Sequence, residues 1–268
     1  MTVAILGAGV MGETVVSGLI RAGRPPAELL VSDRRSGRAG ELNERYGVEV
    51  VSNAEAAAKA DTLMLVVKPQ DMPDLLDEIA PVVRVGQLIV SLAAGITTAT
   101  IEARLPDAIA VVRVMPNTAA LVDEGMAAIS RGSHCDESHL VEAERLLMAT
   151  GRVIRVPEKQ QDAVTAISGS GPAYLFFVVE SMIEAGVHLG LPRSTATELV
   201  VQTMVGSAKL LRETGEHPTV LRERVTSPGG TTAAAIRKLE EHKVRAAFMT
   251  AMESARDRSR WLASGESE

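Results

Sequence analysis

A glycine-rich loop directly after a short apolar segment is the feature that most constrains the fold of this chain. The apolar run Val3–Leu6 is followed by Gly7-x-Gly9-x-x-Gly12 and then by a helical stretch. In such a strand–loop–helix unit the first glycine permits a tight turn, the second lets the backbone approach a pyrophosphate, and the third allows close helix–strand packing. Because Asp33 lies about twenty residues after the loop, the motif predicts a dinucleotide-binding unit rather than a structural glycine turn.

Apolar and helical segments alternate through the first half of the chain, which is typical of an α/β Rossmann-type domain with a doubly wound, mostly parallel sheet. The strands that we expect are Val3–Leu6, Leu29–Ser32, Val48–Val51, Thr62–Val66, Leu88–Ser91, Ile109–Val114, Met126–Ile129 and Val153–Arg155. After Pro157 the expected elements are all helical: Lys159–Ile167, Pro172–Leu189, Arg193–Thr214, Pro218–Val225, Thr231–Glu241 and Val244–Leu262. We therefore predict a dinucleotide-binding domain over residues 1–157 and an all-α domain over residues 158–268.

The composition favours a cytoplasmic protein with a full hydrophobic core. Hydrophobic residues make up 46% of the 268 residues, and the net charge of −6 without a basic block argues against nucleic acid as a partner. The single cysteine, Cys135, cannot form an intrachain disulfide and fits a reducing compartment. The first apolar run lacks a cationic start, so we expect no signal peptide. The longest strongly apolar stretch, Ala173–Val179, is too short to span a bilayer, so we expect no membrane association.

The segment Ala173–Val179 is apolar on every side, which predicts a helix that is buried all round. A helical domain of about 110 residues is small for enclosing such a helix by itself. We therefore expect a second copy of the chain to cover it, giving a homodimer through the helical domain. The alternative is the core of a monomeric helix bundle.

Loops at the carboxyl ends of parallel strands are the expected ligand site of a doubly wound sheet. An acid after the second strand normally accepts the ribose 2′-hydroxyl of NAD, whereas Arg and Ser hold the 2′-phosphate of NADP. If Ser32 occupies the strand tip, Asp33 points away and Arg34 or Arg35 faces the phosphate, which favours NADPH with NADH also possible. The cofactor contacts expected from these loops are Leu6, Gly7, Ala8, Gly9, Val10, Met11, Gly12, Ser32, Arg34, Arg35, Val66, Val67, Lys68, Pro69, Ala93, Ala94, Met115 and Pro116.

A second glycine-rich element, Thr226–Thr232, stands directly before a predicted helix. Backbone N–H groups at a helix start bind anions, and because no strand precedes this loop, a small carboxylate fits better than a second dinucleotide. The alternative is N-capping by threonine, which competes for the same N–H groups. The substrate contacts that we expect are Asn117, Ser227, Gly229, Gly230, Thr231 and Thr232.

Two further patterns in the sequence give a weaker indication. Ser168–Pro172 opens the apolar helix and is interpreted equally well as a helix cap with a proline in the first turn or as a segment that approaches the ligand. The five histidines lack metal-ligand spacing, so we expect no metal site.

Taken together, these motifs resemble those of the pyrroline-5-carboxylate reductase family over nearly the whole chain. The resemblance is carried by Ile5–Gly12, Val66–Pro69, Met115–Thr118, Ser168–Tyr174, Gly215–Pro218 and, most specifically, Ser227–Thr232. Ala119 departs from the pattern, because the family usually has proline there. The resemblance implies an oxidoreductase that reduces 1-pyrroline-5-carboxylate to L-proline with NAD(P)H in the last step of proline biosynthesis. It also implies a cofactor contact from Asn53, and interlocked dimers that often assemble into rings.

The resemblance further implies that Gly230, Thr231 and Thr232 hold the substrate carboxylate and ring nitrogen. A cyclic imine is easily protonated, so the enzyme mainly positions the reactants. We expect the Thr232 hydroxyl to hydrogen-bond the ring nitrogen as the catalytic group, with the nicotinamide near Met115–Asn117. Alternatives are another cyclic imine reductase, a β-hydroxyacid dehydrogenase with Lys159 as its base, or a non-catalytic NADPH-sensing module that would leave the second glycine loop without a purpose.

Overall fold

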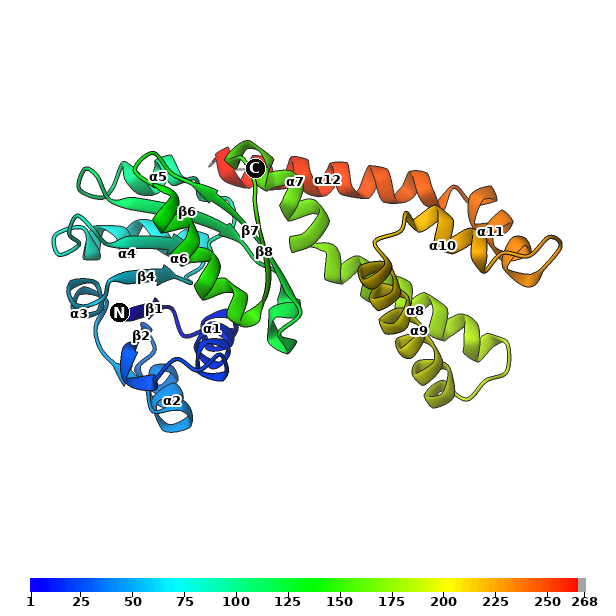
Figure 1. Ribbon diagram of the computed structural model, residues 1–268, viewed down its shortest axis with the longest axis horizontal. Helices are drawn as coiled ribbons and strands as arrows, with labels where there is room; N and C mark the ends of the chain where they lie inside the picture. The colour runs from blue at the N-terminus through cyan, green and yellow to red at the C-terminus, as the bar shows by residue number, and fades with distance from the viewer. Residues whose placement is uncertain (265–268) are drawn as a thin grey trace. The chain divides into compact units, whose positions relative to one another are not determined.

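The computed structural model describes residues 1–264 and divides into two compact units (Figure 1). The first unit comprises residues 1–170 together with the chain from Ala255 onward, and the second is Gly171–Ser254. The returning segment is tied to the first unit by a hydrogen bond of 2.8 Å from the Ser259 hydroxyl to Asp162 Oδ1. The chain therefore leaves the first unit once and comes back to it.

An eight-stranded sheet with the order β3-β2-β1-β4-β5-β6-β7-β8 forms the centre of the first unit. Strands β1 to β6 pair in parallel, whereas β7 pairs antiparallel with β6 and parallel with β8. The predicted doubly wound, mostly parallel sheet is thus confirmed, and its last two strands are reversed. The strands are β1 (Val3–Leu6), β2 (Leu29–Ser32), β3 (Glu49–Val50), β4 (Thr62–Leu65), β5 (Leu88–Ser91), β6 (Ala110–Met115), β7 (Gly125–Arg131) and β8 (Gly151–Arg155).

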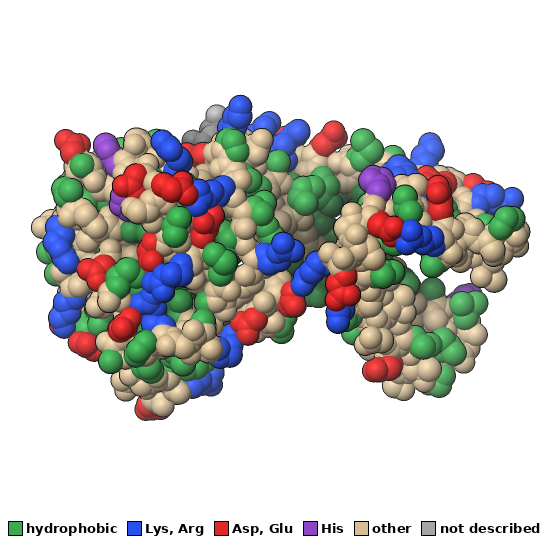
Figure 2. Space-filling view, viewed as in Figure 1, with side chains coloured by type: hydrophobic (Ala, Val, Ile, Leu, Met, Phe, Trp, Pro, Cys, Tyr) green, Lys and Arg blue, Asp and Glu red, His purple; other side chains and the backbone are tan. Residues whose placement is uncertain are grey.

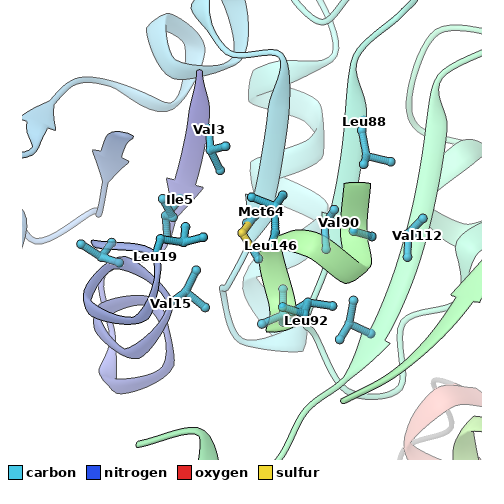
Figure 3. Close-up of a cluster of buried hydrophobic side chains, with 14 of the residues drawn as sticks. Val3, Ile5, Val15, Leu19, Met64, Leu88, Val90, Leu92, Val112 and Leu146 are labelled. Atoms are coloured by element: carbon cyan, nitrogen blue, oxygen red, sulfur yellow. The ribbon is translucent and has the colours of Figure 1, made fainter. Parts of the chain in front are cut away.

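Helices on both faces of the sheet explain why its central strands are apolar at successive positions. Alternate residues of a strand point to opposite faces, so Val3 and Ile5 join one core cluster while Ala4 and Leu6 join the other. The first cluster receives side chains from α1 (Val10–Arg21), α2 (Ser36–Tyr46) and α6 (Glu137–Leu147), and part of it is drawn in Figure 3. The second receives side chains from α3 (Asn53–Lys59), α4 (Met72–Ile79) and α5 (Thr98–Glu102).

Short helical turns link several of these elements and lead into the second unit. The segment after β8 runs through α7 (Gln161–Val164) into a π-helical turn, Thr165–Gly169. The short 3₁₀ helices are η1 (Pro26–Glu28), η2 (Pro69–Asp71), η3 (Thr118–Val122), η4 (Met148–Thr150) and η5 (Glu158–Gln160).

The second unit is entirely helical. Its elements are α8 (Gly171–His188), α9 (Arg193–Thr214), α10 (Pro218–Arg224), α11 (Thr231–Glu241) and the first part of α12 (Val244–Ser264). Helices α8 and α9 pack closely where Gly186 meets Ala196, since a Cβ at Gly186 would lie 2.9 Å from the Ala196 Cβ. Nevertheless α8 buries none of its residues within the chain, and Phe176 and Phe177 are 68% and 69% exposed. Figure 2 shows hydrophobic side chains at the surface of this unit.

The helical run Glu158–His188 is long and apolar enough to cross a membrane, by length and composition alone. This corrects the expectation that no stretch of the chain is long enough. That expectation considered only the unbroken apolar run Ala173–Val179, whereas the helical run extends it at both ends. A helix that is buried against a second subunit can be equally long and apolar, so length and composition do not distinguish it from a membrane-spanning helix.

Candidate dinucleotide site and second glycine loop

A cavity of about 710 Å³ opens where β1, β2 and β4 end, at the point where the strand order reverses. This is the edge at which doubly wound sheets bind ligands. The structure brings together here residues of three predicted loops, Asn53 at the start of α3, and residues of η2 and α4. The lining residues are Gly7, Gly9, Asp33, Arg34, Arg35, Asn53, Val66, Val67, Lys68, Gln70, Asp71, Asp74, Leu75 and Glu78.

The three glycines of the first loop serve different purposes. Gly7 has a φ of +112°, and a Cβ there would lie 2.5 Å from the Val66 carbonyl oxygen. A Cβ at Gly12 would lie 1.9 Å from the Gly7 carbonyl oxygen, so both positions are required by the fold itself. At Gly9, by contrast, a Cβ would meet nothing within 4 Å. The open space at Gly9, which is the N-cap of α1 and makes no side-chain cap, fits a pyrophosphate bound to the helix N-terminus.

The Ala8 peptide of this loop is held on both sides. Its N–H donates to Asp33 Oδ2 at 2.8 Å, and its carbonyl accepts from Arg38 Nε at 2.8 Å. The Asp33 carboxylate is thus turned toward this loop N–H, and its pointing away from the cofactor phosphate stays a prediction. Burial raises the pKa of Asp33, but hydrogen bonds from Arg35 and Ala8 outweigh it and leave the pKa below its usual range.

The polar side chains predicted to meet the adenosine ribose all have protein partners. The Ser32 hydroxyl donates to Asn53 Oδ1 at 2.5 Å, and Asn53 Nδ2 donates to Glu78 Oε2 at 2.7 Å. Arg34 donates to Asp71 Oδ1 at 3.0 Å and to Asp74 Oδ2 at 3.3 Å, and Arg35 Nε donates to Asp33 Oδ1 at 3.2 Å. Each of these four side chains thus donates to at least one oxygen of the chain.

Sequence reasoning missed the acids Asp71, Asp74 and Glu78. They follow the predicted Val66–Pro69 loop: Asp71 ends η2, whereas Asp74 and Glu78 are four residues apart and lie on one side of α4. That periodicity was the available signal, but acids at the start of a helix are also favoured by the helix dipole alone.

Other predicted cofactor and substrate contacts lie outside this cavity. Met11, Pro116 and Asn117 line a separate hollow of about 10 Å³, where Asn117 Oδ1 accepts from the Met126 N–H at 3.0 Å. Among the remaining predicted contacts, Leu6 and Ala93 are buried. A Cβ at Gly169 would lie 2.3 Å from Met115 Cε, which gives this glycine of the Ser168–Pro172 motif a packing reason.

The second glycine loop lies in the second unit, at the start of α11. Gly229 has a φ of +68°, and the Gly230 N–H donates to the Ser227 carbonyl at 3.0 Å. Gly230 is the N-cap residue and makes no side-chain cap, so the alternative of threonine capping is not adopted. Thr231 is exposed and Thr232 is half-buried. First-turn N–H groups without a side-chain cap, beside two hydroxyls, form a site that suits a small carboxylate.

His139, His217 and Cys135 have structural roles. His139 and His217 accept backbone hydrogen bonds at the starts of α6 and α10. Cys135 donates to the Val111 carbonyl at 3.0 Å, and burial raises the pKa of its thiol. Within residues 1–264, no group of three or more His, Cys, Asp or Glu side chains is arranged to hold a metal ion.

Known proteins match this chain over both units. Residues 158–262 match the family of pyrroline-5-carboxylate reductase dimerisation domains, and residues 2–95 match the family described as NADP oxidoreductase, coenzyme F420-dependent. The chain is 45% identical to a pyrroline-5-carboxylate reductase of Corynebacterium melassecola, covering 97% of this chain and 98% of that one. It is 42% identical to the Mycobacterium tuberculosis protein of the same name, covering 97% and 96% of the two chains.

Solved structures agree with these matches. A pyrroline-5-carboxylate reductase from Coxiella burnetii has a TM-score of 0.93 at 36% identity and covers 98% of each chain. The Plasmodium falciparum pyrroline carboxylate reductase, solved with NADP bound, has a TM-score of 0.88 at 28% identity, again covering 98% of each chain. The identities and the near-complete coverage show that this chain belongs to the pyrroline-5-carboxylate reductase family.

Proposed function

We propose that this protein reduces 1-pyrroline-5-carboxylate to L-proline with NADPH or NADH. Membership of the family supports this reaction. The single structural observation that carries it is the uncapped N-terminus of α11 beside Thr231 and Thr232, in a chain that also contains a dinucleotide cavity. A sensor module that only bound a dinucleotide would have no use for this second anion site.

The first unit fits the proposed cofactor. When bound, the dinucleotide supplies the hydride. The N–H groups at Gly9 and the first turn of α1 hold its pyrophosphate, and Ser32, Arg34, Arg35 and Asn53 surround its adenosine ribose. The remaining proposed contacts are Leu6, Gly7, Ala8, Val10, Met11, Gly12, Val66, Val67, Lys68, Pro69, Ala93, Ala94, Met115 and Pro116.

The second glycine loop performs the substrate chemistry. The N–H groups of the first turn of α11, which follows its N-cap residue Gly230, orient the substrate carboxylate, with the Thr231 hydroxyl as a further donor. The Thr232 hydroxyl hydrogen-bonds the ring nitrogen and relays the proton that this nitrogen keeps in the product amine. Ser227, Gly229 and Asn117 complete the proposed substrate contacts.

We propose a cytoplasmic homodimer, assembled further into a ring of dimers, without membrane or nucleic-acid partners. The match to a dimerisation family and the exposed apolar surface of α8 support self-association. We also propose a functional division at residues 157 and 158, supported by the start of the dimerisation match at residue 158. The compact helical unit begins later, at Gly171.

The test is a reductase assay with 1-pyrroline-5-carboxylate, following the loss of NADPH and, in parallel, of NADH, with chromatographic detection of proline. Substrate-dependent oxidation with stoichiometric proline supports the proposal. A folded protein that binds the cofactor but oxidises neither form with the imine would overturn it. Loss of NADPH or NADH with a 3-oxoacid, giving a 3-hydroxyacid as product, would indicate the dehydrogenase alternative.

A further inference from the structure

Arg34 is held by two acids that line the same cavity. It lies after β2, whereas Asp71 and Asp74 lie at the end of η2 and in the first turn of α4. The two ion pairs, at 3.0 Å and 3.3 Å, therefore link loops that follow two different strands. The side chains of Arg34 and Asp74 are 61% and 80% exposed, so these pairs lie at the solvent-accessible mouth, where partners exchange readily.

The charges around the cavity are nearly balanced, with a small excess of acid. Its lining contains the acids Asp33, Asp71, Asp74 and Glu78 and the bases Arg34, Arg35 and Lys68. A phosphate monoester adds roughly two negative charges, whereas a ribose hydroxyl adds none. Acids in this wall therefore disfavour the binding of NADP, which carries the additional phosphate, and leave the binding of NAD nearly unaffected.

The acids weaken the binding of a 2′-phosphate through Arg34, because Arg34 is the side chain for which the phosphate and the acids compete. A guanidinium is the preferred partner of a phosphate because it donates two parallel hydrogen bonds. In this chain a 2′-phosphate would have to replace carboxylates that already accept from Nη1 and Nη2. A ribose hydroxyl needs no such exchange.

We propose that Asp71 and Asp74 are specificity-determining residues, which weaken the discrimination between NADPH and NADH by competing with the 2′-phosphate for Arg34. This inference rests on the proposed use of a nicotinamide dinucleotide, but not on the reduction of an imine. Two arginines after β2 would by themselves favour NADPH. Because the acids reduce that preference, the inference explains how such a chain would also accept NADH.

The test is calorimetric titration of the full-length protein with NADP⁺ and, separately, with NAD⁺. Asp74→Asn removes one competitor, and Asp71→Asn/Asp74→Asn removes both. The matched control is Asp77→Asn, on the same helix, because Asp77 is paired with Arg104 at 2.9 Å and does not line the cavity. Melting temperatures of all variants verify that they remain folded.

We expect Asp74→Asn to tighten NADP⁺ binding by about 2- to 5-fold, the range for an exposed ion pair, and the double variant to tighten it further. NAD⁺ binding and the Asp77→Asn variant should stay within error of the unmodified protein. Adding Arg34→Ala to the double variant should remove the gain.

Three results would overturn the inference. An unchanged NADP⁺/NAD⁺ ratio in the double variant would show that the acids do not compete, and an equal shift in Asp77→Asn would show a general effect of charge. Failure of the unmodified protein to bind either dinucleotide would remove the cofactor proposal together with this one.

If the NADP⁺/NAD⁺ ratio shifts as expected but the protein reduces no imine, only the proposed reaction fails.

Discussion

The carboxylate of Asp33 accepts a hydrogen bond from the Ala8 backbone N–H at 2.8 Å, across 25 positions of sequence. The acid after β2 therefore anchors the glycine loop after β1. This contact stabilises the loop in the shape that leaves space at Gly9, because the Asp33 side chain is only 10% exposed and Ala8 is fully buried.

Replacing Asp33 should destabilise the first unit. In Asp33→Ala the buried Ala8 N–H loses its partner, which costs about 1–3 kcal/mol in the free energy of unfolding. Urea denaturation followed by circular dichroism measures this loss. Asp33→Asn keeps an acceptor oxygen and should recover part of the stability; equal losses in the two variants would contradict the role of the hydrogen bond.

The same carboxylate predicts a pH dependence of stability. Because the pKa of Asp33 is lower in the folded chain than its ordinary value of 3.8, its contribution is present above that value and lost as the pH falls through the folded pKa. The difference in unfolding free energy between the unmodified protein and Asp33→Asn should therefore shrink between about pH 5 and about pH 2. A difference that stays constant over this range would assign the stabilisation to a group other than the Asp33 charge.

Two alanine substitutions should separate folding from cofactor binding in the glycine loop. Gly9→Ala adds a methyl group in open space and should leave the melting temperature nearly unchanged while weakening dinucleotide binding by 10-fold or more, roughly the effect of losing one or two charge-assisted hydrogen bonds. Gly12→Ala places a Cβ against the Gly7 carbonyl and should lower the stability itself. Thermal melts with calorimetric titration measure both. Unimpaired binding by Gly9→Ala would place the pyrophosphate elsewhere.

Loss of the Thr232 hydroxyl should slow the proposed reduction. Thr232→Ala should lower kcat/KM by about 10- to 1000-fold, the range for removing one positioned donor. Cofactor affinity should not change, because the role proposed for the Thr232 hydroxyl is a hydrogen bond to the substrate nitrogen. Thr232→Ser retains the hydroxyl and is the matched control. Unaltered steady-state kinetics of Thr232→Ala would exclude this hydroxyl from the mechanism.

The apolar surface of α8 should be required for self-association. Phe176→Ser/Phe177→Ser removes two exposed aromatic side chains, and the dimer should dissociate to monomers at micromolar concentration in light scattering after size-exclusion chromatography. Val85→Ser is the control, because Val85 is equally exposed, at 69%, but lies in the first unit. A dimer that persists in the double variant would place the interface on another helix.

The sequence predicted the central strands well because burial on both faces makes them continuously apolar. β1, β2 and β5 begin and end at the predicted residues. For α3, the sequence predicted only that a helical segment lies between two strands, since the alanine-rich segment Asn53–Lys59 has little polar–apolar periodicity from which to set its bounds. The reversal of β7 and β8 could not be predicted, because the alternation of apolar residues does not depend on strand direction.

The loops of the first glycine motif were predictable from glycine spacing, but the side chains around them were not. The direction of Asp33 depends on the N–H of Ala8, and the pairing of Arg34 depends on acids 37 and 40 positions away. Such contacts appear only once the strand order places the loops together. For the second glycine loop, the sequence left capping and anion binding open, and the backbone at Gly230 shows that no side-chain cap forms.

The return of α12 to the first unit makes the second unit an insertion rather than a C-terminal appendage. A single protease cut within Gly171–Ser254 would yield two fragments that both carry part of the first unit. The Ser259–Asp162 hydrogen bond and the Arg260–Asp162 ion pair would hold these fragments in one particle. The nicked protein would thus co-purify as an intact species and come apart only when the Rossmann unit itself unfolds.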